Sequence, residues 1–334
     1  MARFVVRRLL LLLPILLGLS ILLFVWVRAL PGSTAQALLG ERATPAAIAR
    51  FNRQTGLDRP ITTQYWAYLK TTVRGDLGTS VASRRPVTTE IKERFPATIE
   101  LALAAMVFAL VIGLPLGFFA AKHYGRLFDH SSLFLSLIGI SIPVFFLAII
   151  LKYIFSVRLG WLPSIGRQDV LIDAEHPTGF YVLDGIITGN WNAAWDASKH
   201  LILPAIALGS IPLAIIARVT RASTIDVQNE DYVRTARAKG LAPGIIDRRH
   251  VLRNALLPVT TIIGLQVGIL LGGAVLTETV FAIPGMGSWL KEAIFNQDYP
   301  ALQGGILFLA FVFVVVNLLV DITYGLINPQ IRVS

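Results

Sequence analysis

Six long apolar runs dominate the sequence, and each is long enough to cross a lipid bilayer as a helix. The hydrocarbon core of a bilayer takes about 20 mostly apolar residues in helical form. The runs cover residues 9–30, 98–121, 133–157, 201–219, 256–276 and 304–327. Only 15% of the 334 residues are charged, whereas soluble proteins carry about a quarter. The sequence therefore predicts an all-α, polytopic membrane protein with six transmembrane helices.

Two of these runs need comment. The first follows three arginines and precedes the small-residue pattern at 35–37, so a cleaved signal peptide is an alternative. Its apolar stretch exceeds the 7–15 residues usual for a signal peptide, which favours retention as the first helix. The fourth run is the weakest, because Pro204, Gly209 and Pro212 interrupt it.

Basic residues predict the orientation of the chain. The net charge is +10, and Arg3, Arg7 and Arg8 precede the first run. Eight Lys or Arg residues lie between positions 218 and 253, in the loop after the fourth run. Cytoplasmic loops carry such an excess of positive charge. Both termini, including Arg332, are therefore predicted to be cytoplasmic, and the basic charge reflects topology, with no nucleic-acid partner expected.

These assignments divide the chain into four predicted parts. Residues 1–30 form a cytoplasmic N-terminus and the first transmembrane helix, and residues 31–96 an external helical segment. Residues 97–328 form a core of five transmembrane helices that includes a cytoplasmic loop at 218–258, and residues 329–334 a cytoplasmic tail.

In the external segment, Thr44 and Pro45 predict the start of a helix that ends at Gly56. A second helix is expected around residues 65–69, followed by a turn at 75–78. This segment either buttresses the helices or helps to dock an external partner. The Gly-, Pro- and Trp-rich loop at 158–199 suits a surface that receives a partner or solute.

The cytoplasmic loop is predicted to contain a short, capped helix. Asn229 is expected to cap its start, and Gly240 to end it in a left-handed conformation. The first turn is acidic and the last turn is basic, as the helix dipole favours. Tyr232, Ala236 and Gly240 recur at intervals of four. One face is therefore predicted to let a groove on another protein approach closely.

A second helix is predicted to run from Pro243 toward the fifth apolar run, and Glu230 is expected to pair with Arg234 along the first helix. The alternative is an amphipathic loop attracted to anionic membrane lipid, which would also explain the arginines. The defined stop at Gly240 and the small residues favour a docking element.

Residues 231–241, followed by 249–258 (Arg-His-Val-Leu-Arg-Asn-Ala-Leu-Leu-Pro), resemble the ATPase-docking loop of ABC importer permeases. More narrowly, they resemble the dipeptide/oligopeptide/nickel permease family, and the similarity covers nearly the whole chain. Further motifs that carry it lie at 56–60, 64–65, 75–80, 96–101, 160–163, 200–204, 278–281, 284–285, 298–300 and 328–332. One departure is Arg234-Thr235-Ala236, where the general loop begins Glu-Ala-Ala, so the resemblance implies no role for an acidic residue at that first position.

The resemblance implies a type I ABC importer permease in the bacterial inner membrane. It implies that the helix in the groove of a separate ATPase is formed by Asp231, Tyr232, Arg234, Thr235, Ala236, Arg237, Ala238, Lys239, Gly240 and Leu241. It also implies a second homologous permease, two ATP-binding subunits and an external solute-binding protein. ATP and Mg²⁺ would be bound by the ATPases, with no cofactor in this chain. Peptides are the first choice of cargo; nickel chelates, glutathione or another small solute are alternatives.

Polar residues in or near the apolar runs are candidates for lining a translocation path, because ionisable groups at membrane depth usually face a bundle interior or water. They are Lys152, Gln266, Glu278, Asn317 and Asp321. Glycines at 264, 268, 272 and 273 share one face and more often indicate close helix packing than gating.

Motifs of catalysis are missing from the sequence. It contains no G-x-x-x-x-G-K-[ST], H-E-x-x-H or G-x-S-x-G, no cysteine, and no metal-ligand spacing among its five histidines. A non-catalytic membrane subunit is therefore expected. An ion-coupled secondary transporter is the other possibility, although no convincing internal repeat supports it.

Overall fold

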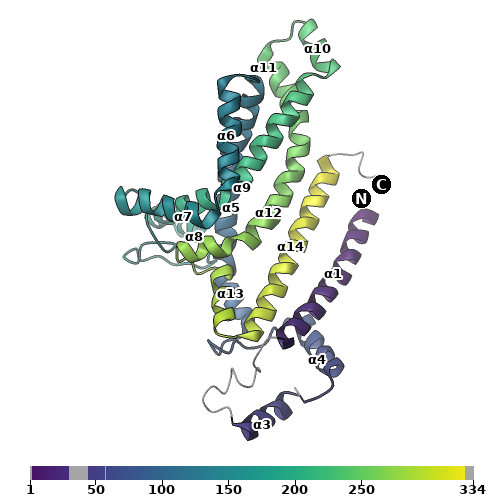
Figure 1. The fold of residues 1–334 in the computed structure, drawn as a ribbon, viewed down its shortest axis with the longest axis vertical. Coiled ribbons are helices and arrows are strands. Elements are labelled where there is room, and N and C mark those ends of the chain that lie inside the picture. The colour runs from purple at the N-terminus through teal and green to yellow at the C-terminus, as the bar shows by residue number, and fades with distance from the viewer. Residues whose placement is uncertain (1, 30–43, 57, 328–334) are drawn as a thin grey trace. The chain divides into compact units, whose positions relative to one another are not determined.

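The computed structural model describes residues 2–29, 44–56 and 58–327, and within these ranges the regular structure is helical. The 35–37 pattern, Arg332 and the predicted tail lie outside the described residues. The helices are α1 (Ala2–Ala29), α3 (Pro45–Thr55), α4 (Ile61–Val73), α5 (Val87–Lys122), α6 (Leu127–Ser141), α7 (Val144–Leu151), α8 (Tyr181–Ile187), α9 (Trp191–Gln228), α10 (Asp231–Ala238), α11 (Pro243–Ile245), α12 (Arg253–Val280), α13 (Met286–Phe295) and α14 (Tyr299–Ile327), with π-helical turns η2 (Lys152–Arg158) and η3 (Ile246–Leu252) (Figure 1).

Four described segments are long and apolar enough to cross a membrane, or five if a bent pair counts as one. They are Val87–Lys122, Trp191–Gln228, Pro243–Gly272 and Tyr299–Val320, and the bent pair is Leu127–Ser141 with Val144–Arg158. The segment Leu13–Ala29 of α1 is a shorter apolar helix. The chain is therefore a polytopic helical protein, and the count of six spans stays a prediction.

The third apolar run forms two helices instead of the expected single one. Helices α6 and α7 meet at an angle of 103°. Ile142 is extended, with φ −81° and ψ 124°, and Pro143 follows it. A residue before proline is pushed out of the helical region, and proline itself has no N–H to donate. The run therefore breaks at Pro143.

The fourth run, expected to be the weakest of the six helices because of its prolines, forms one continuous helix. Helix α9 continues for 38 residues through Pro204 and Pro212. Its apolar window is 67% buried, the highest share among the four candidate spans. Neighbouring helices can stabilise a helix that contains proline within a membrane. Packing by α12, α8, α6 and α7 surrounds α9 in this way.

The described chain separates into two compact units. The first contains residues 97–283 and the end of α14 from residue 316. Within it, α9 lies alongside α6 and α12 (Figure 1). Glycines allow α5 to approach α9 closely: a Cβ added at Gly117 would lie 2.3 Å from the Ala217 carbonyl oxygen, and one at Gly209 would lie 2.6 Å from that of Ala105. Close backbone approach at small residues is the usual way that membrane helices pack.

The second unit contains residues 2–96 and 284–315. Its apolar core includes Val87, Ile91, Met286 and Trp289. Asp298 accepts hydrogen bonds from Ser80 Oγ at 2.5 Å and from the Ala301 amide at 3.1 Å. This carboxylate therefore joins the turn before α5 to the start of α14.

Local signals in the second unit were predicted correctly. The Thr44 hydroxyl accepts from the Ala47 amide at 3.2 Å at the start of α3, and Gly56 ends that helix with φ +72°. Helix α4 contains the expected aromatic segment. Gly75 and Gly78 both have positive φ in the expected turn.

Candidate functional site

Helix α10 of the first unit is the predicted docking helix, and it begins one residue later than expected. Asn229 was predicted to cap it, but Asn229 is the C-cap of α9, and its amide donates to the Asp226 carbonyl at 3.1 Å. Glu230 is extended, with φ −67° and ψ 145°, and occupies the N-cap of α10. The preference of Asn for helix ends did not distinguish the end of one helix from the start of the next.

The end of α10 confirms the role predicted for Gly240. Gly240 has φ +72°, and its amide donates to the Arg237 carbonyl at 3.0 Å. The Leu241 amide donates to the Ala236 carbonyl at 3.3 Å. These two bonds form a Schellman motif, in which a left-handed residue closes a helix.

The inner face of α10 packs on the loop that carries it. Val233 and Ala236 are 0% and 5% exposed and contact Ile246 and Val251. Phe118 of α5 packs against the same cluster. Ala236 is therefore not on an open docking face, and that part of the predicted face was wrong. The two apolar residues at an interval of three define the buried side, as in any amphipathic helix.

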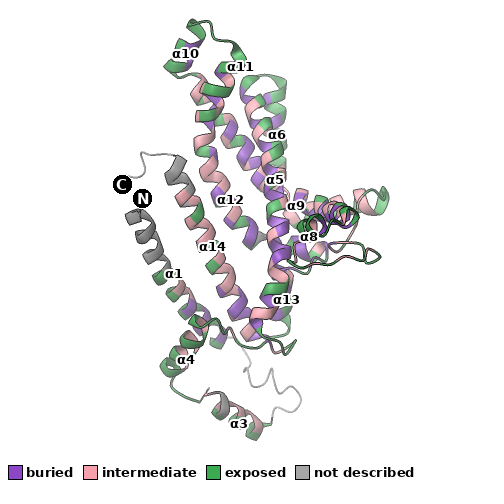
Figure 2. Cartoon of the chain, turned by 180° about the vertical axis from the view of Figure 1, so that it is seen from behind, coloured by how far each residue is buried: buried purple, intermediate pink, exposed green. Residues whose placement is uncertain are grey.

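The outer face of α10 is exposed (Figure 2). Its exposed residues within the predicted docking set are Asp231, Tyr232, Arg234, Thr235, Arg237, Ala238, Lys239, Gly240 and Leu241. Arg234 Nη1 lies 3.4 Å from Asp231 Oδ1, so Arg234 pairs with Asp231. The pair with Glu230 that the sequence predicted is not formed. The Tyr232 hydroxyl accepts from Asn254 Nδ2 at 2.9 Å, which attaches α10 to the start of α12.

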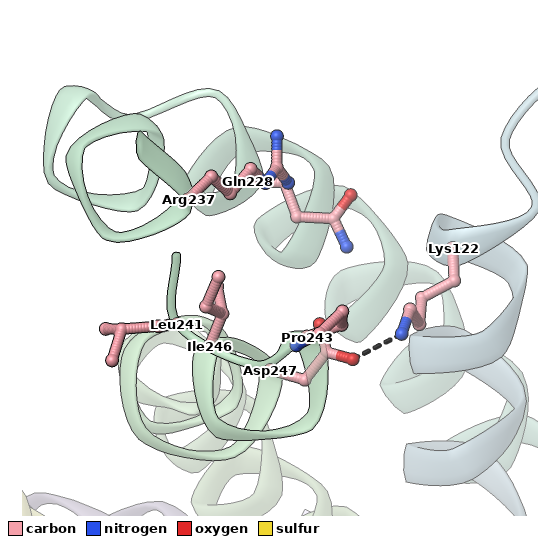
Figure 3. Close-up of a pocket in the computed structure, with 7 residues that line it drawn as sticks. All are labelled: Lys122, Gln228, Arg237, Leu241, Pro243, Ile246 and Asp247. Atoms are coloured by element: carbon pink, nitrogen blue, oxygen red, sulfur yellow. Dashed lines mark hydrogen bonds and ion pairs between the residues drawn. The ribbon is translucent and has the colours of Figure 1, made fainter. Parts of the chain in front are cut away.

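Two ion pairs anchor the surroundings of α10. Lys122, at the end of α5, pairs with Asp247 of η3 (Figure 3). Arg221 of α9 pairs with Asp129 of α6, and one of their two contacts, Nη2 to Oδ2, is 2.7 Å. Asp129 is only 1% exposed. The predicted second helix does start at Pro243 and continues through α11 and η3 into α12.

The candidate path residues do not form one cluster. Glu278 is 0% exposed and accepts from Thr98 Oγ1 at 2.6 Å. Lys152 Nζ donates to the Val280 carbonyl at 3.0 Å, near the same end of α12. Gln266 is 5% exposed, and Asn317 on α14 is half-buried. The side chain of Asp321 lies outside the described part of the chain.

Among the glycines expected to share a packing face on α12, Gly264 does lie in close contact, since an added Cβ would meet Val320 Cγ1 at 2.0 Å. An added Cβ at Gly272 would have open space. Close packing therefore holds for part of this face.

A buried polar cluster on the loop before α8 was missed by the sequence analysis. Arg167 Nη2 lies 2.6 Å from Glu100 Oε2, and the ring of His176 stacks on Tyr181 at 3.5 Å between centroids. Burial lowers the pKa of His176, while Asp184 opposes this shift. A single acidic residue, Glu100, within an apolar run was the available signal.

Comparisons with known proteins agree with this architecture. Residues 113–333 match the family model "binding-protein-dependent transport system inner membrane component", and residues 1–102 match the N-terminal model of the same system. The dipeptide transport system permease protein DppB of Alkalihalophilus pseudofirmus is 47% identical over 99% of this chain and 100% of that protein. The di/tripeptide transport system permease protein DppB of Pseudomonas aeruginosa is 50% identical over 99% of both.

A solved structure of the inward-facing MetNI methionine ABC transporter covers 70% of this chain and 93% of its own, with a TM-score of 0.53 at 16% identity, which shows a shared fold. The chain therefore belongs to the family of binding-protein-dependent transport system inner membrane components, as a multi-pass protein of the bacterial inner membrane.

Proposed function

We propose that this chain is the permease subunit of an ATP-driven peptide importer, in which it forms the translocation path together with a second homologous permease. The observation that carries the proposal is the construction of α10. Its inner face is packed and its end is fixed by Gly240, while its outer residues remain exposed. A helix that is held in place on one face presents its exposed residues to another protein in a defined geometry, which favours docking because less conformational freedom is lost on binding.

The position of α10 supports a role in coupling. It lies in the loop between α9 and α12, two long helices of the first unit that contact each other. Tyr232 and the cluster around Val233 connect it to α12, η3 and α5. A displacement of α10 would therefore act on several helices at once. Two separate ATPase subunits, which bind ATP and Mg²⁺, would supply this displacement by closing and opening.

Peptides are the proposed cargo, delivered by an external solute-binding protein. The relatives named above are dipeptide and di/tripeptide permeases and match over 99% of this chain. Lys152, Gln266, Glu278, Asn317 and Asp321 remain candidates for the path, half of which the second permease would line.

The test is uptake by the complete complex in proteoliposomes, loaded with binding protein and assayed against dipeptides, tripeptides, glutathione and nickel chelates. We expect ATP-dependent uptake of short peptides that stops when the ATPase subunits are inactivated. Uptake that follows an ion gradient and ignores ATP would refute the importer assignment. ATP-dependent uptake of chelates or glutathione alone would refute only the cargo.

A further inference from the structure

Helix α12 is attached to other elements of the first unit at both of its ends. At its start, Asn254 Nδ2 donates to the Tyr232 hydroxyl of α10 at 2.9 Å. At its other end, Lys152 Nζ of η2 donates to the Val280 carbonyl at 3.0 Å. Between these contacts α12 is one helix of 28 residues, continuous through Pro258, that runs from the α10 side of the unit toward α7 (Figure 1). A displacement of α10 that moves α12 as a whole would therefore arrive at Lys152.

The last turn of α12 is closely fixed by its neighbours. The Phe281 carbonyl accepts from the Gly166 amide at 2.8 Å. Glu278, which is fully buried, accepts from Thr98 Oγ1 of α5 at 2.6 Å. Ala282 follows with φ +51°, and a residue other than glycine keeps a left-handed conformation only where its surroundings determine it. This end of the helix is therefore a defined structure to which other elements can be joined.

Lys152 fixes the position of η2 against this end of α12. Helix α7, which leads into η2, packs against α12. Apolar packing is non-directional, whereas a hydrogen bond has a preferred distance and angle. The half-buried Lys152 also places a cation at the carbonyl end of α12, where the helix dipole favours it. It is the first residue of η2, and π-helical turns occur frequently at functional sites.

We propose that Lys152 is a positioning residue for transport, which couples a movement of α12 to η2 and to the segment 158–167 that follows, and that it acts through Val280 and not by binding the cargo. Through this bond, α10 and the segment 158–167 would move in a concerted way. The inference rests on the proposed function, and it gives a different role to one of the candidate path residues.

Contact with a carboxylate of the peptide is the competing role for Lys152, because ionisable groups at membrane depth often face the solute path. A cationic contact with the cargo would favour acidic peptides over basic ones. A mechanical link between α12 and η2 does not depend on the charge of the cargo. The two roles therefore predict different patterns of uptake across a set of peptides.

The first experiment measures uptake per ATP hydrolysed in proteoliposomes of the complete complex, with Ala-Ala, Ala-Glu and Ala-Lys as probes. Lys152→Met keeps the length of the side chain and removes its donor. It should lower uptake of all three dipeptides about tenfold, the factor that corresponds to one charge-assisted hydrogen bond. Lys152→Arg keeps a charged donor and should retain most of the uptake. Lys291→Met, the same change at a half-buried lysine of α13 in the second unit, should leave uptake unchanged.

The second experiment needs no cargo. Hydrogen–deuterium exchange of the complete complex is measured with and without trapping by ATP and vanadate, and the readout is the protection of residues 158–167. The wild-type complex and Lys152→Arg should both show a change in protection on trapping, and Lys152→Met should not. If Lys152→Met does not assemble, Asn254→Ala decides, because it removes the bond at the other end of α12 and should abolish the same change.

Three results would overturn the inference. They are a loss in Lys152→Met that is confined to Ala-Glu, undiminished uptake of all three dipeptides in that variant, and a protection of residues 158–167 that does not respond to trapping in the wild-type complex. A wild-type complex without ATP-dependent uptake would instead refute the proposed function, since that result involves no variant.

Discussion

Substitutions at Gly240 test whether α10 transmits force to the membrane helices. Their effect on the backbone at this position can be separated from the effect of side-chain volume. Its φ of +72° is left-handed, and an added Cβ would have no neighbour within 4 Å. A Cβ at this position therefore meets no neighbour, and the main cost of a substitution comes from the left-handed backbone. An L-residue in this conformation costs about 1–2 kcal/mol, with β-branched residues at the upper end and Asn well below it.

These costs predict a graded series. Gly240→Val should destabilise the end of α10 by about 2 kcal/mol, which lowers the ratio of its folded to its locally unfolded form about 30-fold. Gly240→Ala should cost about 1 kcal/mol, and Gly240→Asn a few tenths, although Asn is larger than Ala. The readout is peptide uptake per ATP hydrolysed in proteoliposomes of the complete complex. It should be reduced least by Gly240→Asn, more by Gly240→Ala and most by Gly240→Val.

Gly244→Val is the matched control. Gly244 lies in α11 of the same loop, also with open space around an added Cβ and without a left-handed φ. It should change the stability of the loop by less than about 0.5 kcal/mol and therefore leave peptide uptake per ATP hydrolysed nearly unchanged. Losses that increase with side-chain volume, so that Asn is worse than Ala, would contradict the backbone argument. Equal losses of uptake per ATP hydrolysed in Gly240→Val and Gly244→Val would also contradict the backbone argument.

Three further predictions concern stability and pH, each measured on the purified complex. Gly117→Ala places a Cβ 2.3 Å from the Ala217 carbonyl and should destabilise the α5–α9 contact by about 1–3 kcal/mol, seen as a lower thermal midpoint, whereas Gly272→Ala meets open space and should not. Asp129→Asn removes one partner of a buried ion pair and should cost about 3 kcal/mol; the exchange Asp129→Arg with Arg221→Asp should recover part of this, and no recovery would show that the pair is not the cause. Burial lowers the pKa of His176 below its unfolded value of about 6.5, so the unfolded chain takes up the proton first. The stability from this site is present above about pH 6.5 and decreases as the pH falls through the folded pKa; His176→Phe keeps an aromatic ring against Tyr181 and should reduce this pH dependence of the thermal midpoint.

Features that depend on a few neighbouring residues were predicted well from the sequence. The cap at Thr44, the stops at Gly56 and Gly240 and the helix start at Pro243 all follow from local backbone chemistry. The apolar runs likewise identified the helices, because their length must match the bilayer.

Features that depend on distant contacts were not predictable in this way. Pro143 breaks a helix, whereas α9 continues through Pro204 and Pro212 and packs against α12, α8, α6 and α7. The buried face of α10 is set partly by Phe118, which comes from α5. The pairing of Arg221 with Asp129 joins residues 92 positions apart. Each of these outcomes required knowledge of which helices are neighbours.

The continuity of α9 and the break between α6 and α7 together bear on how a displacement of α10 would spread. A continuous helix moves as a unit, because changing its length would break backbone hydrogen bonds. Helix α9 is continuous over 38 residues, and the Arg221–Asp129 pair attaches its α10 end to α6. Helix α7 contacts α9 and α12, yet it is separated from α6 by the bend at Pro143. A movement that enters at α10 would therefore carry α9 and α6 together, and the bend before α7 is a place in this unit where a change in angle can be absorbed.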